Sequence, residues 1–196
     1  MIRYPNGMTY YGNKKRKKHL TSTELSISSA NRGMELEHLI NQSNEYYQLK
    51  HICLVKKRPV PINVLRMDYT KGARITQAFF EEKSTTDYNG LYKSKYLDFE
   101  AKSTQNSTAF PLNNITKHQI EHLKEVILQN GIAFFIIQFK AHEKIFFVEA
   151  KDVIDFISKN NRKSIPYDFF VKNCEEIKLT YNPYLDYIKI VDKKYF

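Results

Sequence analysis

Apolar positions early in the chain predict a helix followed by a short strand. A stripe at nearly helical spacing runs over residues 33–49 and consists of Leu36, Leu39, Ile40 and Tyr47. Asn31 is a suitable cap at the start of this helix. Residues 52–55 are predicted as a strand. A central strand does not continue through Pro59 and Pro61, because proline cannot donate a hydrogen bond to a sheet ladder.

The next segment predicts a hairpin with a basic tip. Residues 62–69 and 75–82 have the composition of two extended arms, and residues 70–73 join them. Apolar alternation is weak near the tip, where Arg66, Lys71 and Arg74 add positive charge. We therefore expect this hairpin to project from the body of the protein.

A strand with strict alternation is predicted over residues 96–102. Asn89-Gly90 is the strongest turn signal in the chain and leads into it. Leu97, Phe99 and Ala101 lie on one face of this strand. The opposite face carries polar side chains, namely Tyr96, Asp98, Glu100 and Lys102.

The remaining elements indicate one α/β domain with a mixed sheet. Thr116 caps a helix that ends near residue 130, where Gly131 stops it. A buried hairpin follows over residues 132–139 and 145–149, then short helices over 151–159 and 167–174 and an aromatic tail. Residues 1–30 have few apolar positions and a basic run at 14–18, and we expect a flexible arm there. Residues 31–196 form the single folded domain.

Composition and charge narrow the class of protein. Hydrophobic residues make up 42% of the 196 positions, which is typical of a folded globule. The longest apolar run, residues 132–137, is far below the roughly 20 residues that cross a bilayer, and no signal peptide is visible. We expect a cytoplasmic protein without membrane contact, in which Cys53 and Cys174 are reduced core residues.

Positive charge is concentrated rather than spread. The net charge is +10, from 31 Lys and Arg against 21 Asp and Glu, and the excess gathers in residues 1–30 and 50–74. Clustered positive charge attracts a polyanion by releasing its counterions. The charge distribution therefore favours a protein that binds nucleic acid over a soluble protein that is merely basic.

One polar strand face carries candidate catalytic chemistry. Glu100 and Lys102 are two apart on a strand and so share a face, which lets both reach one phosphate. Asp87 precedes the predicted turn, so the returning strand brings it beside Glu100. Few carboxylate ligands and retained water suit Mg²⁺, with Mn²⁺ able to substitute. The alternative is an exposed strand face that mixes charges; Asp98 fits a supporting or salt-bridge role better than that of a ligand.

Several motifs, in order and at matching spacing, resemble the RecU family of bacterial Holliday junction resolvases. They are YPNG at residues 4–7, NRGM at 31–34, TTDYNG at 85–90, DFEAK at 98–102, residues 107–112, and HQIEH at 118–122. The resemblance covers nearly the whole chain and is weakest over residues 8–30 and 151–180. The motif residues that carry the family's chemistry are all present, namely Thr85, Asp87, Glu100, Lys102 and Gln119.

The resemblance implies a PD-(D/E)XK restriction-endonuclease-like fold and a homodimer that resolves four-way junction DNA in recombination and repair. A mixed central sheet flanked by helices is expected, with a projecting stalk at about residues 59–82. The implied Mg²⁺ site comprises Thr85, Asp87, Glu100 and Gln119, with Lys102 as the group that stabilises the transition state. The resemblance also implies a supporting role for Glu37 and a contact of Arg32 with the RecA recombinase. Candidate DNA contacts are Lys56, Lys57, Arg58, Arg66, Lys71, Arg74, Lys93 and Lys95.

Three other functions are compatible with parts of the pattern. A site-specific restriction enzyme would share the catalytic core, and a non-catalytic accessory protein would bind junctions and modulate RecA without needing Asp87 or Glu100. The segment from His118 to His122 also fits the His-x-x-Glu-His pattern of zinc proteases. No downstream glutamate in a suitable helical context supplies a third ligand, so the protease is the weakest of the three.

Overall fold

The computed structural model describes residues 22–80 and 85–196, and gives only the backbone for residues 22–34 and Phe80. The central sheet belongs to a compact unit formed by residues 32–196. Most of the predicted arm, residues 1–21, lies outside the described residues.

Helix α1 spans Ser22–Leu49. Its end agrees with the predicted helix, but its start lies well before residue 33. Residues 22–30 contain few apolar positions, so apolar periodicity carried no helical signal there. Further along, Leu36, Ile40 and Tyr47 are buried against the sheet, as the stripe predicted.

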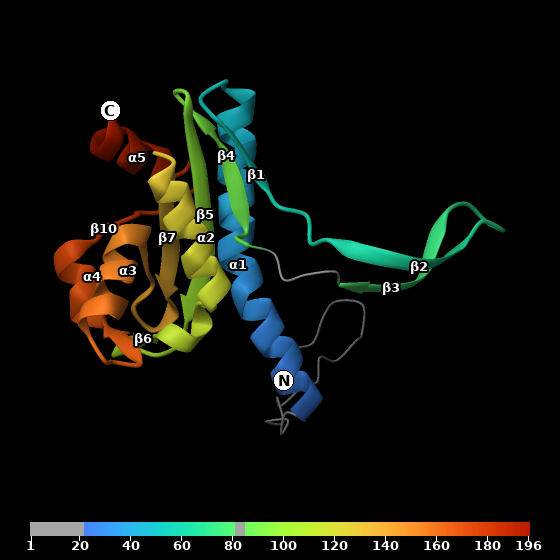
Figure 1. Ribbon diagram of the computed structural model, residues 1–196, viewed down its shortest axis with the longest axis horizontal. Helices are drawn as coiled ribbons and strands as arrows, with labels where there is room; N and C mark the ends of the chain where they lie inside the picture. Colours follow the sequence, from blue (N-terminus) through green and yellow to red (C-terminus); the bar gives the residue numbers. More distant parts are fainter. Residues whose placement is uncertain (1–21, 81–84) are drawn as a thin grey trace, which may run out of the picture. The chain divides into compact units, whose positions relative to one another are not determined.

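The central sheet has six strands in the order β1-β4-β5-β7-β8-β10 (Figure 1). Their bounds are β1 Leu54–Lys57, β4 Tyr88–Tyr92, β5 Lys95–Thr104, β7 Ile132–Phe139, β8 Lys144–Glu149 and β10 Glu175–Glu176. Strands β5 and β7 are parallel, and the other neighbours are antiparallel. A parallel pair needs a crossover, and α2, Lys117–Leu128, provides it. The predicted mixed sheet flanked by helices is confirmed.

Two apolar layers cover the two faces of this sheet. One layer joins α1, the strands and α5, Tyr187–Tyr195, and the other joins α2, α3, Ala150–Lys159, and α4, Tyr167–Asn173. Figure 1 shows α1 and α2 on opposite sides of the strands. Strand β7 is buried on both faces, with Phe134 and Phe135 in different layers. Helix α5 was not predicted; it lies in the aromatic tail, and its Tyr187 and Val191 are fully buried.

Short elements complete the domain. The pair β6, Ala109–Pro111, and β9, Ser164–Pro166, forms a small antiparallel sheet. Single 3-10 turns occur at Leu112–Asn114 and Lys140–His142. Cys53 and Cys174 are free thiols, as expected. In the part of the chain that the structure describes, no helix is both long and apolar enough to cross a membrane.

The turn predicted at Asn89-Gly90 is wrong. Both residues lie inside β4, and the chain reverses at Lys93 and Ser94, whose φ angles are 43° and 65°. Gly90 is required for another reason. A Cβ at this position would lie 2.2 Å from the carbonyl oxygen of Leu54 in the neighbouring strand β1. Close approach of two strands, rather than a turn, therefore explains the glycine.

The predicted hairpin is present as a separate two-stranded sheet. Strand β2, Ile62–Asp68, pairs antiparallel with β3, Arg74–Phe80. Nearly all described side chains between residues 62 and 79 are exposed, and none of them belongs to either core layer. Residues 81–84, at the end of the hairpin, lie outside the described residues.

Candidate active site

Two carboxylates meet where β4 begins beside β5. Tyr88 pairs with Phe99, so Asp87 lies next to Glu100. The backbone N–H of Asp87 donates to Glu100 Oε2 at 2.9 Å, and the N–H of Ala101 donates to Asp87 Oδ2 at 3.2 Å. The antiparallel pairing of the two strands thus produces the juxtaposition that the sequence predicted, although the turn lies further along the chain.

Two further predicted residues contact Glu100. The Lys102 ammonium lies 2.6 Å from Glu100 Oε1, and Gln119 Nε2 donates to the same oxygen at 2.6 Å. The Gln119 Oε1 accepts from the N–H of Thr116 at 3.0 Å, as part of a capping box at the start of α2. Gln119 therefore presents its nitrogen to the site. To ligate a metal through oxygen, its amide would have to turn over.

Burial and mutual repulsion disfavour the charged forms of Asp87 and Glu100. Glu100 is 1% exposed, and burial together with the neighbouring Asp87 charge raises its pKa to about 7, against the opposing effect of Lys102. Burial also raises the pKa of Asp87, and the charge of Glu37 adds to this. A bound cation would relieve the repulsion between these groups, so the pair fits a site for a hard divalent ion.

Few protein side chains are available to coordinate a metal ion at this site. Among the described residues no three His, Cys, Asp or Glu side chains gather closely enough to hold an ion alone. Glu37 is paired with Lys57, and the Thr85 hydroxyl accepts a hydrogen bond from Arg58. Two carboxylates with few other protein ligands and several waters are typical of Mg²⁺ sites.

Asp98 is the centre of a buried network beside this site. Its side chain is fully buried, and its oxygens accept hydrogen bonds from Thr86, Arg58 and, at 3.0 Å, the Tyr96 hydroxyl. His122 Nε2 lies 2.9 Å from Asp98 Oδ2. A carboxylate with this many partners is not free to coordinate an ion. Asp98 therefore fits the supporting or salt-bridge role considered for it.

Arg58 joins both ends of the hairpin to strand β5. It lies just before β2, and its guanidinium contacts both Asp98 and the hydroxyl of Thr85, which follows β3. Its backbone N–H donates to the carbonyl of Asp87 at 2.8 Å. Sequence spacing gave no signal for this cluster, because its members come from three separate segments.

The structure does not support reading the segment from His118 to His122 as a zinc-protease motif. His122 is engaged by Asp98. His118 Nε2 lies 3.4 Å from the Thr116 hydroxyl, and Glu121 forms an exposed pair with Lys117. The two histidines thus contact different partners at the start of α2.

The basic candidates are distributed unevenly around the site. Lys57 and Arg58 lie beside it, and Lys56 contacts Gln48 of α1. Lys93 and Lys95 lie at the other end of β4 and β5, roughly 20 Å away by strand rise. Lys93 is paired there with Asp192. The three hairpin cations, Arg66, Lys71 and Arg74, are exposed, and the side chain of Arg32 lies outside the described part of α1.

Comparison with known proteins identifies the family. The family model described as "Recombination protein U" (RecU) matches residues 31–193. This chain belongs to the RecU family. Curated relatives named "Holliday junction resolvase RecU" include those of Bacillus licheniformis, 46% identical, and Bacillus cereus strain AH820, 44% identical; each match covers 100% of this chain and 98% of the relative.

A solved structure also matches. It is that of Archaeoglobus fulgidus Hjc, a Holliday junction resolvase from an archaeal hyperthermophile. The match covers 74% of this chain and 96% of Hjc, with a TM-score of 0.43 and 11% identity. The RecU assignment rests on the family model and the curated relatives.

Replacing Asp98 by asparagine is expected to loosen this RecU-family site without removing any metal ligand. Arg58 would lose the charge that balances it, and breaking a buried ion pair typically costs about 3 kcal/mol. Denaturant unfolding should show a loss of this order. The exposed variant Asp168→Asn is the matched control and should unfold like wild type. Equal stability of both variants would show that the network contributes nothing.

Proposed function

We propose that this chain is a Mg²⁺-dependent endonuclease that resolves Holliday junctions. The observation that carries the proposal is the contact of Asp87, Glu100 and Lys102 at paired strands of a RecU-family chain. The relatives named as Holliday junction resolvases match the chain over its whole length. An accessory protein that only binds junctions would have no need of this set.

The residues of the chain divide the chemistry among them. Asp87 and Glu100 would hold the ion, with Thr85 and Gln119 as further candidate ligands. When bound, Mg²⁺ lowers the pKa of a coordinated water and offsets charge on the phosphate. Lys102 Nζ donates to Glu100 here and is placed to donate to a phosphate oxygen instead. Glu37 and Asp98 support the site through Lys57 and Arg58.

The substrate class follows from the basic surfaces and from symmetry. Exposed cations on the hairpin suit contacts with phosphates, which position DNA without reading its sequence. Resolution needs two cuts related by a two-fold axis, and an isologous homodimer supplies two sites related in that way. We therefore propose a homodimer acting on four-way junctions, with Arg32 as a candidate contact for RecA.

Synthetic DNA tests this function directly. With Mg²⁺ the protein should cut a four-way junction and leave a linear duplex of the same sequence largely intact. A chelator should abolish cutting, and added Mg²⁺ or Mn²⁺ should restore it. Preferential cutting of linear duplex at one sequence would indicate a restriction enzyme, and junction binding without any cutting would indicate an accessory protein.

A further inference from the structure

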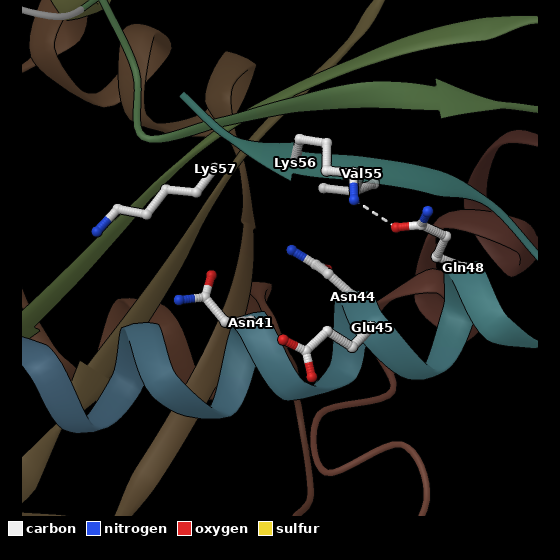
Figure 2. Close-up of a pocket in the computed structure, with 7 residues that line it drawn as sticks. All are labelled: Asn41, Asn44, Glu45, Gln48, Val55, Lys56 and Lys57. Atoms are coloured by element: carbon white, nitrogen blue, oxygen red, sulfur yellow. Dashed lines mark hydrogen bonds between the residues drawn. The ribbon is translucent and has the colours of Figure 1, made fainter. Parts of the chain in front are cut away.

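A polar groove of about 210 Å³ runs between α1 and β1, at the edge of the central sheet (Figure 2). Its polar lining consists of Asn41, Asn44, Glu45, Gln48, Lys56 and Lys57. Of these residues, only Gln48, Lys56 and Lys57 take part in the contacts described above. Asn41, Asn44 and Glu45 have no assigned role.

Both asparagines in the groove are oriented by tyrosines beneath them. Asn41 Oδ1 accepts from the Tyr88 hydroxyl at 3.1 Å, and Asn44 Oδ1 accepts from the Tyr187 hydroxyl. Their oxygens are thus occupied, and their NH₂ groups are left to donate. Asn44 is 6% exposed, and its Nδ2 has no hydrogen-bond partner among the described residues. Buried donors without partners are rare, because their desolvation is not compensated.

The donors in the groove suit an anion. Figure 2 shows the Lys56 ammonium bonded to Gln48 across one end, while Lys57 lies at the other end. Glu45 is the single acid in the lining, and Lys57 is already paired with Glu37, so Lys56 is the ammonium that the groove offers to a ligand. Donors from two amides and one ammonium group fit the oxygens of a phosphodiester.

The groove begins next to the candidate active site. Asn41 follows Glu37 by one helical turn, about 6 Å along α1. Lys57 pairs with Glu37 and lies opposite Tyr88, the residue after Asp87. A DNA strand with one phosphate at Asp87 and Glu100 therefore has a neighbouring phosphate within reach of the groove.

We propose that the groove between α1 and β1 binds a backbone phosphate of the strand that is cut, adjacent to the scissile phosphate. This inference rests on the proposed nuclease function and assigns to it a subsite formed by Asn41, Asn44 and Lys56. Binding there would draw Lys56 away from Gln48 and, by opening the groove, would give the buried Asn44 Nδ2 the acceptor that it lacks. The subsite would fix the register of the strand relative to the metal ligands.

Single neutral methylphosphonates in a synthetic junction test the subsite. They are placed one at a time at the phosphates flanking the cut, and junction affinity is measured in chelator. For wild type, substitution at one flanking phosphate should weaken binding about tenfold, as loss of hydrogen bonds to a charged group predicts. In the double variant Asn41→Asp, Lys56→Gln, the same substitution should no longer weaken binding by more than about twofold. Asn41→Asp keeps the oxygen that accepts from Tyr88.

The matched control is Lys172→Gln, which removes one exposed charge from α4 and should respond to the methylphosphonates as wild type does. The subsite would be overturned if no methylphosphonate near the cut weakens binding by wild type. It would also be overturned if the double variant loses as much affinity as wild type does. Cutting of the unmodified junction with Mg²⁺ is measured in parallel. Normal cutting with no sensitive phosphate overturns the subsite alone, whereas absent cutting overturns the proposed function and the subsite together.

Discussion

Replacing Asp87 by asparagine is expected to slow junction cleavage by about a thousandfold or more. The substitution removes one of the two carboxylates that would hold the ion, and a metal contributes several kcal/mol of transition-state stabilisation. Junction binding should persist or tighten, because a negative charge that repels phosphate is lost. Single-turnover cleavage and binding in chelator measure the two effects separately. Glu100→Gln should behave in the same way.

Asp168→Asn is the matched control for this prediction. It makes the same chemical change at an exposed position of α4, and its cleavage rate should equal that of wild type. Full cleavage by Asp87→Asn or Glu100→Gln would contradict the assignment of the metal site. Loss of binding in parallel with cleavage would instead indicate that the variant disturbs the fold.

Mixed dimers are expected to convert a cruciform plasmid to nicked circles, whereas wild type gives mainly linear product. In the proposed homodimer each protomer would contribute one set of Asp87, Glu100 and Lys102, so one inactive subunit would leave one strand uncut. Two cuts within one bound complex are needed to linearise the plasmid. The mixed species is prepared with one Asp87→Asn subunit carrying a distinct affinity tag, and products are separated on a gel.

A mixed dimer of two wild-type subunits, one tagged, is the control and should linearise the plasmid at the normal rate. Linearisation at that same rate by the Asp87→Asn mixture would refute paired action of two sites. It would leave the assignment of the individual site intact, because that assignment depends on the single-subunit chemistry.

The alternation around Glu100 could be read from the sequence because it is a local property. Successive side chains on a strand point to opposite faces, so Glu100 and Lys102 had to share one. Leu97 and Phe99 are buried in one core layer, as predicted. The position of Asp87 beside Glu100 was also predicted, but the turn was misplaced, because Gly90 serves the close approach of β1 rather than a reversal of the chain.

The C-terminal helix shows why other parts of the fold were not predictable. Helix α5 lies in a tail rich in aromatic residues, and local periodicity did not reveal it. Its Tyr187 is fully buried, and the hydroxyl donates to Asn44, 143 positions earlier in the chain. Contacts at such separation define the helix and the orientation of the asparagine amide together, and no window of neighbouring residues contains them.

The sequence by itself determined the mixed α/β class, the hairpin, and the carboxylates and lysine of the candidate site, because spacing and alternation act between near neighbours. Only the tertiary structure decided how buried those groups are and what surrounds them. Asp98 looked like part of an exposed polar face, yet it is fully buried by Arg58, 40 positions away, and His122, 24 positions away. Burial and pairing of charges depend on which distant segments meet, and that information arises only when the chain is folded.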